Sequence, residues 1–396
     1  MKTSVLFFSD SSLRNPIIHS QGLPFFNHLS TDTYKKIFLS IEWNENIYHN
    51  EQEIARIKNT FSNGIIYYTV TSIFPKIFQN SFFRIIFGCF KLMTLIIKYN
   101  VKIIHTRSYY PALITLISKI LLIRNIKIVY DPRGLFVEER FFLKNIKKKS
   151  VSHKIYEEVE KQFYKKSDIV VLVSNKFKHY ILNKYPNKFS LSSKIVVINN
   201  KTQINKLSNI DNKSKFVKGV YVGSAAPWQN VDELFSLISV SKENNYPIKF
   251  DLITYQKEIF RSKLSTIDNT DLITINSYPS DEVAPELRKY NFGILIRKES
   301  LASEVSSPLK LGEYLASGLP VLAWPGIGDS EEIIKKYNIG VIVKNKDYSK
   351  ALEDMIELLS DENIYYRCWE TARKEFNLDD SIKSYTEIYD RLNKLK

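Results

Sequence analysis

The chain has 396 residues, of which 44% are hydrophobic and 25% charged, and this balance excludes a disordered or fibrous protein. Its length predicts two domains, each with a core of its own. The net charge of +15 comes from the N-terminal half, because residues 1–200 hold 30 Lys and Arg against 13 Asp and Glu, while the remainder holds 27 against 29. This basic half predicts an anionic partner, which leaves nucleic acid, a membrane surface and a polyphosphate substrate open.

Continuous apolar runs separated by helical segments predict strands that are covered on both faces of a sheet. In the first half these runs are residues 4–8, 36–41, 65–69, 101–105, 126–130, 168–173 and 194–198. A polar stretch, 199–215, then indicates an interdomain linker. The alternation restarts at 218–223, 247–254, 271–275, 291–296, 320–324 and 340–343. We therefore predict two tandem doubly wound α/β domains, whose ligands bind at the carboxyl ends of the strands.

That rule defines an expected functional rim in each domain, and two rims facing each other would form a cleft. The rim segments are 131–140, 223–228, 297–310 and 326–329.

The two cysteines, Cys89 and Cys368, lie in apolar or aromatic surroundings and without metal-ligand spacing. We therefore predict that both are core residues of a protein in a reducing compartment and that they do not form a disulfide. The apolar run after Met1 is too short for a signal peptide and is typical of a first buried strand. No stretch reaches 18 uncharged apolar residues, so we predict no transmembrane helix.

Residues 72–100 mix bulky apolar and aromatic side chains with Lys76, Arg84, Lys91 and Lys98. Interfacial helices have this composition, so the segment predicts contact with an anionic membrane surface, and the basic cluster 144–149 could extend the same face. The alternative is a long helix that packs in the core. Nucleic acid is disfavoured because the chain has no recognisable nucleic-acid-binding signature.

The segment 291–328 carries the clearest functional pattern: an apolar strand, a basic loop, a short helix, a second strand and a Gly-rich turn. Ser307 and Pro308 suit the N-cap and first position of a helix that Gly318 would end. Lys310 then falls in the first turn, where the helix dipole disfavours a cation unless an anion lies in front of it. Lys310 shares one helix face with Glu313 and Ser317; the alternative is a buried helix whose lysine reaches solvent.

Tandem Rossmann-like domains with SPLKLGEYLASGLPVLA near the C-terminus resemble a GT-B glycosyltransferase, specifically the retaining family-four type that builds bacterial capsule or O-antigen. IIHTRSYYPA, YDPRGLFVEER, SDIVVLVSNKFKHYI and VYVGSAAPW occur in the expected order. The resemblance implies an acceptor-binding N-terminal domain over 1–208, a nucleotide-sugar-binding domain over 209–372, and a helix over 373–396 that crosses back onto the N-terminal domain.

Carried over to this sequence, the resemblance makes Glu313 the second acidic position of the family's paired-glutamate motif, which binds the nucleotide ribose. The first glutamate would stand at Val305, so Glu304 misses the motif by one position. Arg297 and Lys310 are the cations expected at the donor diphosphate. With Glu313 they form the predicted catalytic set, which would stabilise the departing nucleoside diphosphate.

The remaining donor contacts implied by the resemblance come from the two flanking loops. Ser306 and Ser307 would assist the diphosphate through backbone N–H groups, and Leu311 lies in the same helix. Gly223 and Ser224 follow the first strand of the second domain, where Ser224 replaces the arginine that the family commonly has.

The acceptor is expected at the strand ends of the N-terminal domain. Asp131, Arg133, Glu138 and Glu139 follow one strand and Arg107 follows its neighbour, a set that can bind sugar hydroxyls and an acceptor phosphate. The alternative is an Arg–Glu salt-bridge cluster that fixes the loop.

Arg14, in the first strand-to-helix loop, is a further acceptor candidate, whereas His105 is expected to be a packed residue. All six histidines precede residue 180 without metal-ligand spacing, and no Asp-x-Asp occurs. The predicted enzyme is therefore metal-independent and has no cofactor other than its nucleotide-sugar substrate.

The sequence thus predicts a hexosyltransferase that transfers sugar from a nucleoside-diphosphate donor to a polyprenyl-diphosphate-linked surface glycan. It would act at the inner face of the cytoplasmic membrane, to which the basic N-terminal domain would attach it. Two alternatives remain open: a nucleotide-sugar epimerase on the same fold, and a catalytically silent scaffold subunit at the membrane.

Overall fold

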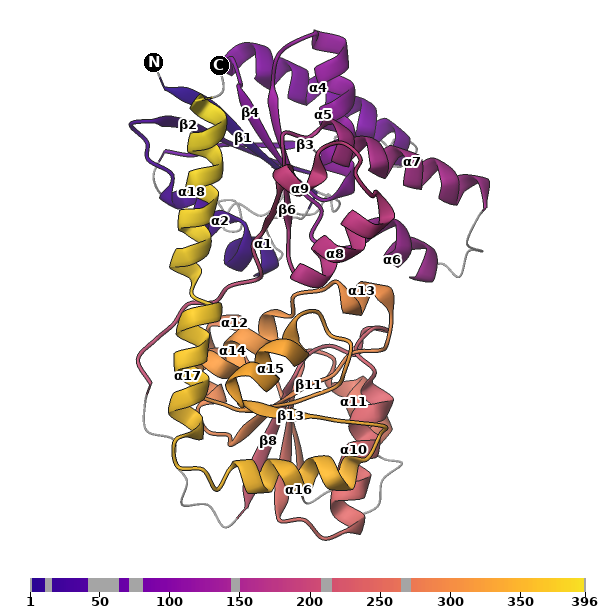
Figure 1. The fold of residues 1–396 in the computed structure, drawn as a ribbon, viewed down its shortest axis with the longest axis vertical. Coiled ribbons are helices and arrows are strands. Elements are labelled where there is room, and N and C mark those ends of the chain that lie inside the picture. The colour runs from indigo at the N-terminus through magenta and orange to yellow at the C-terminus, as the bar shows by residue number, and fades with distance from the viewer. Residues whose placement is uncertain are drawn as a thin grey trace. The chain divides into compact units, whose positions relative to one another are not determined.

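A computed structural model describes residues 2–10, 16–41, 64–70, 81–143, 150–207, 216–264 and 272–394. The chain divides into two compact units (Figure 1). The first, which we call the N-unit, comprises Met1–Val173, Phe177–Ile198 and Asp379–Lys396. The second, the C-unit, comprises Ser174–Lys176 and Asn199–Leu378.

The N-unit is built on a parallel sheet with the strand order β3-β2-β1-β4-β5-β6-β7 in the described part of the chain. Its strands are β1 (Thr3–Ser9), β2 (Tyr34–Ile41), β3 (Ile66–Val70), β4 (Ile103–Arg107), β5 (Lys127–Asp131), β6 (Ile169–Leu172) and β7 (Ile195–Val197). The order reverses between β1 and β4, and the crevice at such a reversal is where doubly wound sheets bind ligands.

Helices cover both faces of the N-unit sheet. They are α1 (Pro16–Gln21), α2 (Leu23–His28), α4 (Ser81–Tyr99), α5 (Tyr109–Leu122), α6 (Phe136–Leu143), α7 (Val151–Lys166), α8 (Asn175–Lys184), α9 (Leu191–Lys194) and α18 (Leu378–Lys394). Helices α4 and α5 share one apolar core with the sheet, and α1, α2 and α18 share another with its opposite face. Because successive strand residues point to opposite faces, Leu6 and Phe8 belong to the first core and Val5 and Phe7 to the second.

The C-terminal helix α18 packs on the N-unit, as the family resemblance implied. Its apolar face, Tyr385, Ile388, Tyr389 and Leu392, is buried in the N-unit core. Polar contacts fix its last turns, because Tyr34 donates a hydrogen bond to Asp390, and burial beside that carboxylate raises the pKa of the Tyr34 phenol. The yellow helix in Figure 1 is therefore an integral part of a unit whose other strands and helices come from the first 198 residues.

The C-unit has a second parallel sheet, with the order β10-β9-β8-β11-β12-β13 in the described residues. Its strands are β8 (Val217–Val222), β9 (Ile248–Ile253), β10 (Ile273–Asn276), β11 (Phe292–Leu295), β12 (Val321–Ala323) and β13 (Gly340–Ile342). Its helices are α10 (Val231–Glu243), α11 (Lys257–Leu264), α12 (Ser280–Leu287), α13 (Leu301–Glu304), α14 (Leu309–Ala316), α15 (Ser330–Tyr337), α16 (Tyr348–Leu358) and α17 (Ile364–Glu375).

These two sheets confirm the predicted fold class, and each predicted strand overlaps an observed one. Cys89 and Cys368 are buried and free, which confirms their predicted place in the core. Among the residues that the structure describes, no helix combines the length and hydropathy needed to span a bilayer.

The described part of the predicted linker, residues 199–207, belongs to the C-unit. Thr202 exchanges backbone hydrogen bonds with the chain before α18: its N–H donates to the Phe376 carbonyl over 2.8 Å, and its carbonyl accepts from Leu378 N–H over 3.1 Å. Further along, Trp369 Nε1 donates to the Asn205 carbonyl over 2.8 Å. The remainder of the linker, 208–215, lies outside the described residues.

Candidate active site

Helix α14 begins one residue later than predicted, because Pro308, not Ser307, is its N-cap. Ser307 instead accepts a hydrogen bond on Oγ from Asn200 N–H over 2.9 Å, and its carbonyl accepts one from Asn200 Nδ2. Gly318, at φ +84°, follows the helix in the left-handed conformation that glycine adopts most readily. The cap prediction was wrong because Ser307 has a distant partner that the local sequence does not reveal.

The outer face of α14 carries an ion pair between Lys310 Nζ and Glu313 Oε2, three residues apart. Both side chains are partly exposed, while Leu311 and Tyr314 on the opposite face are buried. Lys310 and Glu313 thus lie opposite Leu311 and Tyr314, as predicted, whereas Ser317, predicted on the polar face, is buried and its hydroxyl donates to the Glu313 carbonyl. Lys310 in the first turn and Glu313 in the next therefore lie side by side on a helix at the carboxyl end of the C-unit sheet.

The predicted rim segments of the C-unit are joined by hydrogen bonds at this edge of the sheet. Lys298 N–H donates to the Trp228 carbonyl over 2.8 Å, and Ser303 Oγ donates to the Lys298 carbonyl over 2.7 Å. Gly328 N–H donates to the Ser303 carbonyl over 2.9 Å. The loops that follow β8, β11 and β12 therefore form one connected surface before α14.

On that surface, Gly328 packs directly against the backbone of the segment before α14. A Cβ added to Gly328 would lie 1.9 Å from the Ser306 carbonyl oxygen, and its φ of +47° already disfavours any side chain. The Ser306 N–H and Oγ both bond to the Ser303 carbonyl, so the segment before α14 is held by its own backbone as well as by this glycine.

We expect Gly328→Ala to displace the 303–307 segment and to weaken nucleotide binding about tenfold, because the new methyl group cannot fit beside the Ser306 carbonyl. Gly326→Ala is the matched control: it also has positive φ, +72°, but nothing lies within 4 Å of its Cβ position. Both variants should lose about 1 kcal/mol of stability to backbone strain. Titration calorimetry with a nucleoside diphosphate should separate them, and equal affinities would show that the close contact is irrelevant to the site.

The loop after β8 holds two further predicted donor residues. Tyr221 donates a hydrogen bond to the Ser224 carbonyl over 2.9 Å, and a Cβ on Gly223 would lie 2.4 Å from the Tyr221 hydroxyl oxygen. Burial raises the pKa of Tyr221, and the nearby charge of Arg297 opposes that rise. Arg297, half-buried after β11, is therefore close to this loop, as predicted for a donor-binding cation.

Three other predicted positions have different surroundings. The Leu311 side chain lies in the C-unit core and its N–H bonds to the Pro308 carbonyl, so it supports the helix rather than facing solvent. Glu304 is exposed at the end of α13, whereas Val305, at the motif position of the first glutamate, is buried. Exposure thus leaves Glu304 accessible, although it stands one residue from the motif position.

In the N-unit, the predicted acceptor residues Asp131 and Arg107 are buried in one polar cluster. Asp131 lies 3.5 Å from Arg133, 3.8 Å from Arg107 and 3.5 Å from His105 Nε2. The helix α18 closes this cluster: Tyr385 donates to Asp131 over 3.4 Å, and the Tyr389 hydroxyl lies 2.7 Å from His105 Nδ1. His105 is a packed residue, as expected.

The charges of this cluster fix the ionisation of its members. Burial alone would raise the pKa of Asp131, but the charges of Arg133 and Arg107 and the hydrogen bond from His105 outweigh it and lower the pKa to about 2. Burial also lowers the pKa of His105, so the ring is neutral at pH 7, and lowers that of Arg107 to about 10. Asp131 is thus a buried anion whose partners within the N-unit are already in place, and its role at the acceptor stays a prediction.

The other acceptor candidates are spread over the loop and helix after β5. Arg133 keeps part of its surface exposed and has a positive φ of +63°. The carboxylate of Glu139 lies close to Gly134: a Cβ added to Gly134 would be 2.5 Å from Glu139 Oε1. Arg133 forms an Arg–Asp ion pair with Asp131 over 3.5 Å. Arg14 lies outside the described residues.

Comparison with known proteins supports the assignment that the fold suggests. The profile of Glycosyltransferase Family 4 matches residues 49–202, and that of the glucosyltransferase 3-like C-terminal domain matches residues 238–375. An uncharacterized glycosyltransferase of Methanocaldococcus jannaschii is 25% identical over 332 residues, which cover 80% of each chain. The chain is a glycosyltransferase, and its residues 49–202 match family 4.

Solved structures with the same fold include a glycosyltransferase of Rickettsia africae, with a TM-score of 0.69 and 18% identity over 100% of both chains. The Anabaena protein HepE in complex with UDP matches with a TM-score of 0.68 and 12% identity over 99% of this chain and 100% of its own. The fold of this glycosyltransferase is therefore GT-B. Of the three functions that the sequence left open, the assignment supports sugar transfer from a nucleoside-diphosphate donor.

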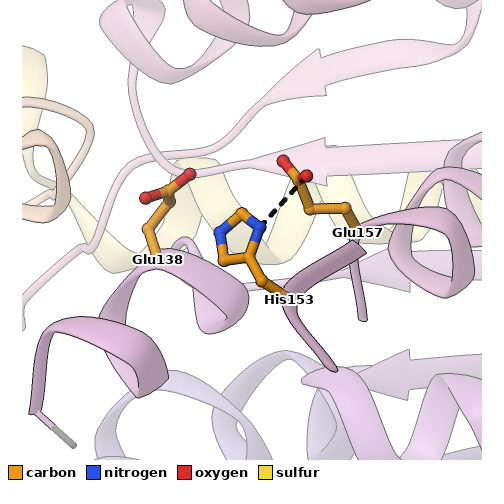
Figure 2. Close-up of side chains that lie close together, drawn as sticks. All are labelled: Glu138, His153 and Glu157. Carbon is orange, nitrogen blue, oxygen red and sulfur yellow. Dashed lines mark ion pairs between the residues drawn. The ribbon is translucent and has the colours of Figure 1, made fainter. Parts of the chain in front are cut away.

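A histidine with two glutamates forms a cluster that the sequence pattern did not indicate (Figure 2). Glu138 on α6 and His153 and Glu157 on α7 each bring one possible ligand atom within 4.8 Å of the others, and His153 Nδ1 lies 3.2 Å from Glu157 Oε2. The spacing of His153 and Glu157 places them on one helix face, but their approach to Glu138 depends on tertiary packing. Lys184 Nζ, 3.2 Å from Glu157 Oε1, already supplies positive charge here.

Glu160, one turn further along α7, is almost completely buried, and Lys184 Nζ lies 4.0 Å from its Oε2. Burial raises the pKa of Glu160 to about 7, against the opposing charge of Lys184 and with help from Glu138. The folded transferase therefore holds this carboxyl group protonated at a pH where the unfolded chain, with a pKa near 4.5, has released the proton.

We expect the glycosyltransferase to lose about 3 kcal/mol of stability from this residue as pH rises from about 4.5 to 7, because the raised pKa favours folding only while Glu160 is protonated. The Glu160→Gln variant has a side chain of the same shape that does not titrate. The free energy of unfolding of this variant should therefore fall less than that of the native protein over this pH range. Urea unfolding at pH 5 and pH 8 measures the difference. Identical pH slopes for both proteins would mean that Glu160 is ionised in the folded state.

Proposed function

We propose that this glycosyltransferase binds the donor on the C-unit surface formed by α14 and the loops after β8 and β11. Lys310 and Arg297 would contact the diphosphate, and Glu313 would accept hydrogen bonds from the ribose hydroxyls. The observation that carries the proposal is the ion pair between Lys310, in the first turn of α14, and Glu313, one turn further along. A cation in the first turn opposes the helix dipole, and a bound diphosphate would remove that conflict.

The pair also suggests how the donor changes the site. In the free protein, Lys310 and Glu313 neutralise each other. A diphosphate would attract Lys310 more strongly than one carboxylate does, because it carries more charge and more acceptor oxygens. Glu313 would then be released to accept from the two ribose hydroxyls, so diphosphate and ribose recognition are coupled through one ion pair.

During transfer, the two cations would stabilise the charge that develops on the departing nucleoside diphosphate. As the family resemblance implies retention, the leaving phosphate itself would take the proton of the acceptor hydroxyl. No side chain then has to act as general base, and Asp131, which is buried among cations, is not needed for that role.

The acceptor we propose is a growing surface glycan, of the capsule or O-antigen type, carried on a polyprenyl diphosphate at the inner face of the cytoplasmic membrane. Support comes from the basic charge of residues 1–200, which would attract a diphosphate and anionic lipids. Arg133 is the predicted acceptor residue that combines a cation with an exposed surface at the end of β5.

A thermal-shift panel of nucleoside diphosphates and nucleotide sugars, with and without EDTA, tests the donor proposal. Uridine nucleotides come first, since HepE of the same fold is in complex with UDP. A ligand at 100 times its dissociation constant should stabilise the protein by about 2.7 kcal/mol. Stabilisation by one nucleotide family, unchanged by EDTA, supports a metal-independent donor site, and no stabilisation by any nucleotide contradicts the proposal.

A further inference from the structure

The outer face of α4 is apolar although it is exposed. Phe82, Ile86, Phe90 and Ile97 are between 46% and 71% exposed, and their spacing places them along one side of the helix. The inner side of the same helix packs against the N-unit sheet through residues such as Leu92 and Ile96. The sequence left open whether this segment contacts a membrane or packs in the core. The inner face of α4 packs in the core, while its outer face presents bulky apolar side chains to solvent.

The end of α5 adds to this face. Ile120 and Leu121 in its last turn and Ile123 at its C-cap are between 62% and 92% exposed. Ile123 has a φ of +49°, a left-handed conformation that is unusual for a β-branched residue and that glycine or asparagine commonly takes at this position. The backbone of Ile123 is strained and its side chain is not buried, so packing within the fold does not account for an isoleucine at this position.

The two helices lie side by side on the same face of the sheet (Figure 1). A Cβ on Gly88 of α4 would lie 2.6 Å from Ile114 Cδ1 of α5, so the helices pack closely. Each connects two parallel strands of the N-unit sheet, α4 from β3 to β4 and α5 from β4 to β5, so both run in the same direction and their last turns lie at the same end. We name the seven exposed residues the α4–α5 face: Phe82, Ile86, Phe90, Ile97, Ile120, Leu121 and Ile123.

The ionic residues of the sequence segment that forms this face all have one sign, although Asp168, from outside the segment, pairs with Lys127 after α5. Residues 54–130 contain no Asp or Glu, and residues 81–130 contain eight Lys and Arg. Lys98 and Arg124 are exposed at the ends of the two helices. Lys91 Nζ lies 4.9 Å from the Tyr68 ring centre, so an aromatic side chain positions this cation beside α4. An apolar stripe on a segment whose own ionic groups are all cations matches the interface of an anionic bilayer, where apolar side chains enter the acyl region and lysines contact phosphates.

We propose that the α4–α5 face docks this glycosyltransferase onto an anionic lipid bilayer, into which its seven apolar side chains insert. The inference deepens the proposed function, on which it rests for the lipid-linked acceptor, by naming the surface that contacts the membrane. A protein partner would also cover apolar side chains, but it would not require every ionic group over 77 consecutive residues to be a cation.

Co-sedimentation of the full chain with lipid vesicles tests the proposal. We expect binding to vesicles that contain phosphatidylglycerol, weak binding to phosphatidylcholine alone, and loss of binding in high salt. The variant Phe82→Ser/Phe90→Ser/Ile97→Ser should bind at least about tenfold more weakly, because burying even one such side chain is worth that factor. The matched control is Tyr255→Ser/Ile259→Ser/Tyr366→Ser, which removes comparably exposed side chains from the C-unit and should bind like the native chain.

Thermal stabilisation by the nucleotide identified above shows that each variant is folded and reports on the donor site independently of lipid. Native-like vesicle binding by the α4-face variant, or no binding by the native chain, overturns the docking proposal and leaves the donor proposal standing. A native dimer that this variant converts to a monomer in light scattering also overturns it, because the face would then be a contact between copies of the chain. If no nucleotide binds but vesicles do, the donor proposal fails and docking stands.

Discussion

Replacing Glu313 by glutamine is expected to raise the dissociation constant of the nucleoside diphosphate ten- to a hundredfold. A hydrogen bond to a charged group contributes about 1.5–3 kcal/mol, and the neutral amide offers one acceptor oxygen to the ribose hydroxyls where the carboxylate offers two. The substitution also removes the ion pair with Lys310, so the lysine would be free for phosphate before the donor arrives. Free inorganic pyrophosphate should therefore bind Glu313→Gln no more weakly than it binds the native chain, which separates ribose recognition from diphosphate recognition.

The control for this variant is Glu331→Gln on α15, which removes a comparable Lys–Glu ion pair, with Lys335, from a helix of the same unit. Its nucleotide affinity should equal that of the native chain. Isothermal titration with the nucleoside diphosphate and with pyrophosphate gives both numbers. A Glu313→Gln variant with native nucleotide affinity would remove Glu313 from the donor site, and a loss of affinity for both ligands would indicate that the loop had moved.

The strands were predictable because parallel sheets covered on both faces require continuous apolar runs, and such runs are visible in a single sequence. The two faces of α14 were predictable for the same kind of reason, since the spacing of Lys310 and Glu313 fixes their side of the helix. These features depend on neighbours within one turn or one strand. They need no knowledge of what packs against them.

The features that could not be predicted depend on partners far away in the sequence. Ser307 was expected to cap α14, but its hydroxyl is bound by Asn200, 107 residues earlier. Asp131 was expected at the acceptor because it ends a strand, yet Tyr385, 254 residues later, donates to it inside a closed cluster. A strand-end position identifies the rim of a sheet but does not show whether another helix covers that part of the rim.

The α4 segment shows the same limit in a different form. Its composition was compatible with a membrane helix and with a core helix, because composition does not give the direction in which each side chain points. Exposure resolves this, since Leu92 is fully buried while Phe90, two residues earlier, is mostly exposed. Without the packing of α4 against the sheet, the two faces could not have been told apart.

Replacing Asp131 by asparagine is expected to destabilise the N-unit by about 3 kcal/mol and to lower its melting temperature by about 6–12 °C. The carboxylate is fully buried between Arg107 and Arg133, and without it these two cations repel each other at a site where water cannot compensate. Differential scanning calorimetry measures the change. The control, Asp361→Asn, removes a partly exposed pair with Arg367 and should cost at most about 1 kcal/mol.

The pH dependence of the native protein should report the same interaction. Because the pKa of Asp131 is lowered from 3.8 to about 2 in the folded state, the carboxylate stabilises the fold above about pH 4, and this contribution, about 2 kcal/mol, is lost as pH falls towards 2. The Asp131→Asn variant lacks this titration, so the stability difference between the two proteins should shrink over that range. An asparagine variant with native melting temperature but impaired transfer would reverse the assignment and return Asp131 to the acceptor site, because a buried structural anion cannot be removed without a cost in stability.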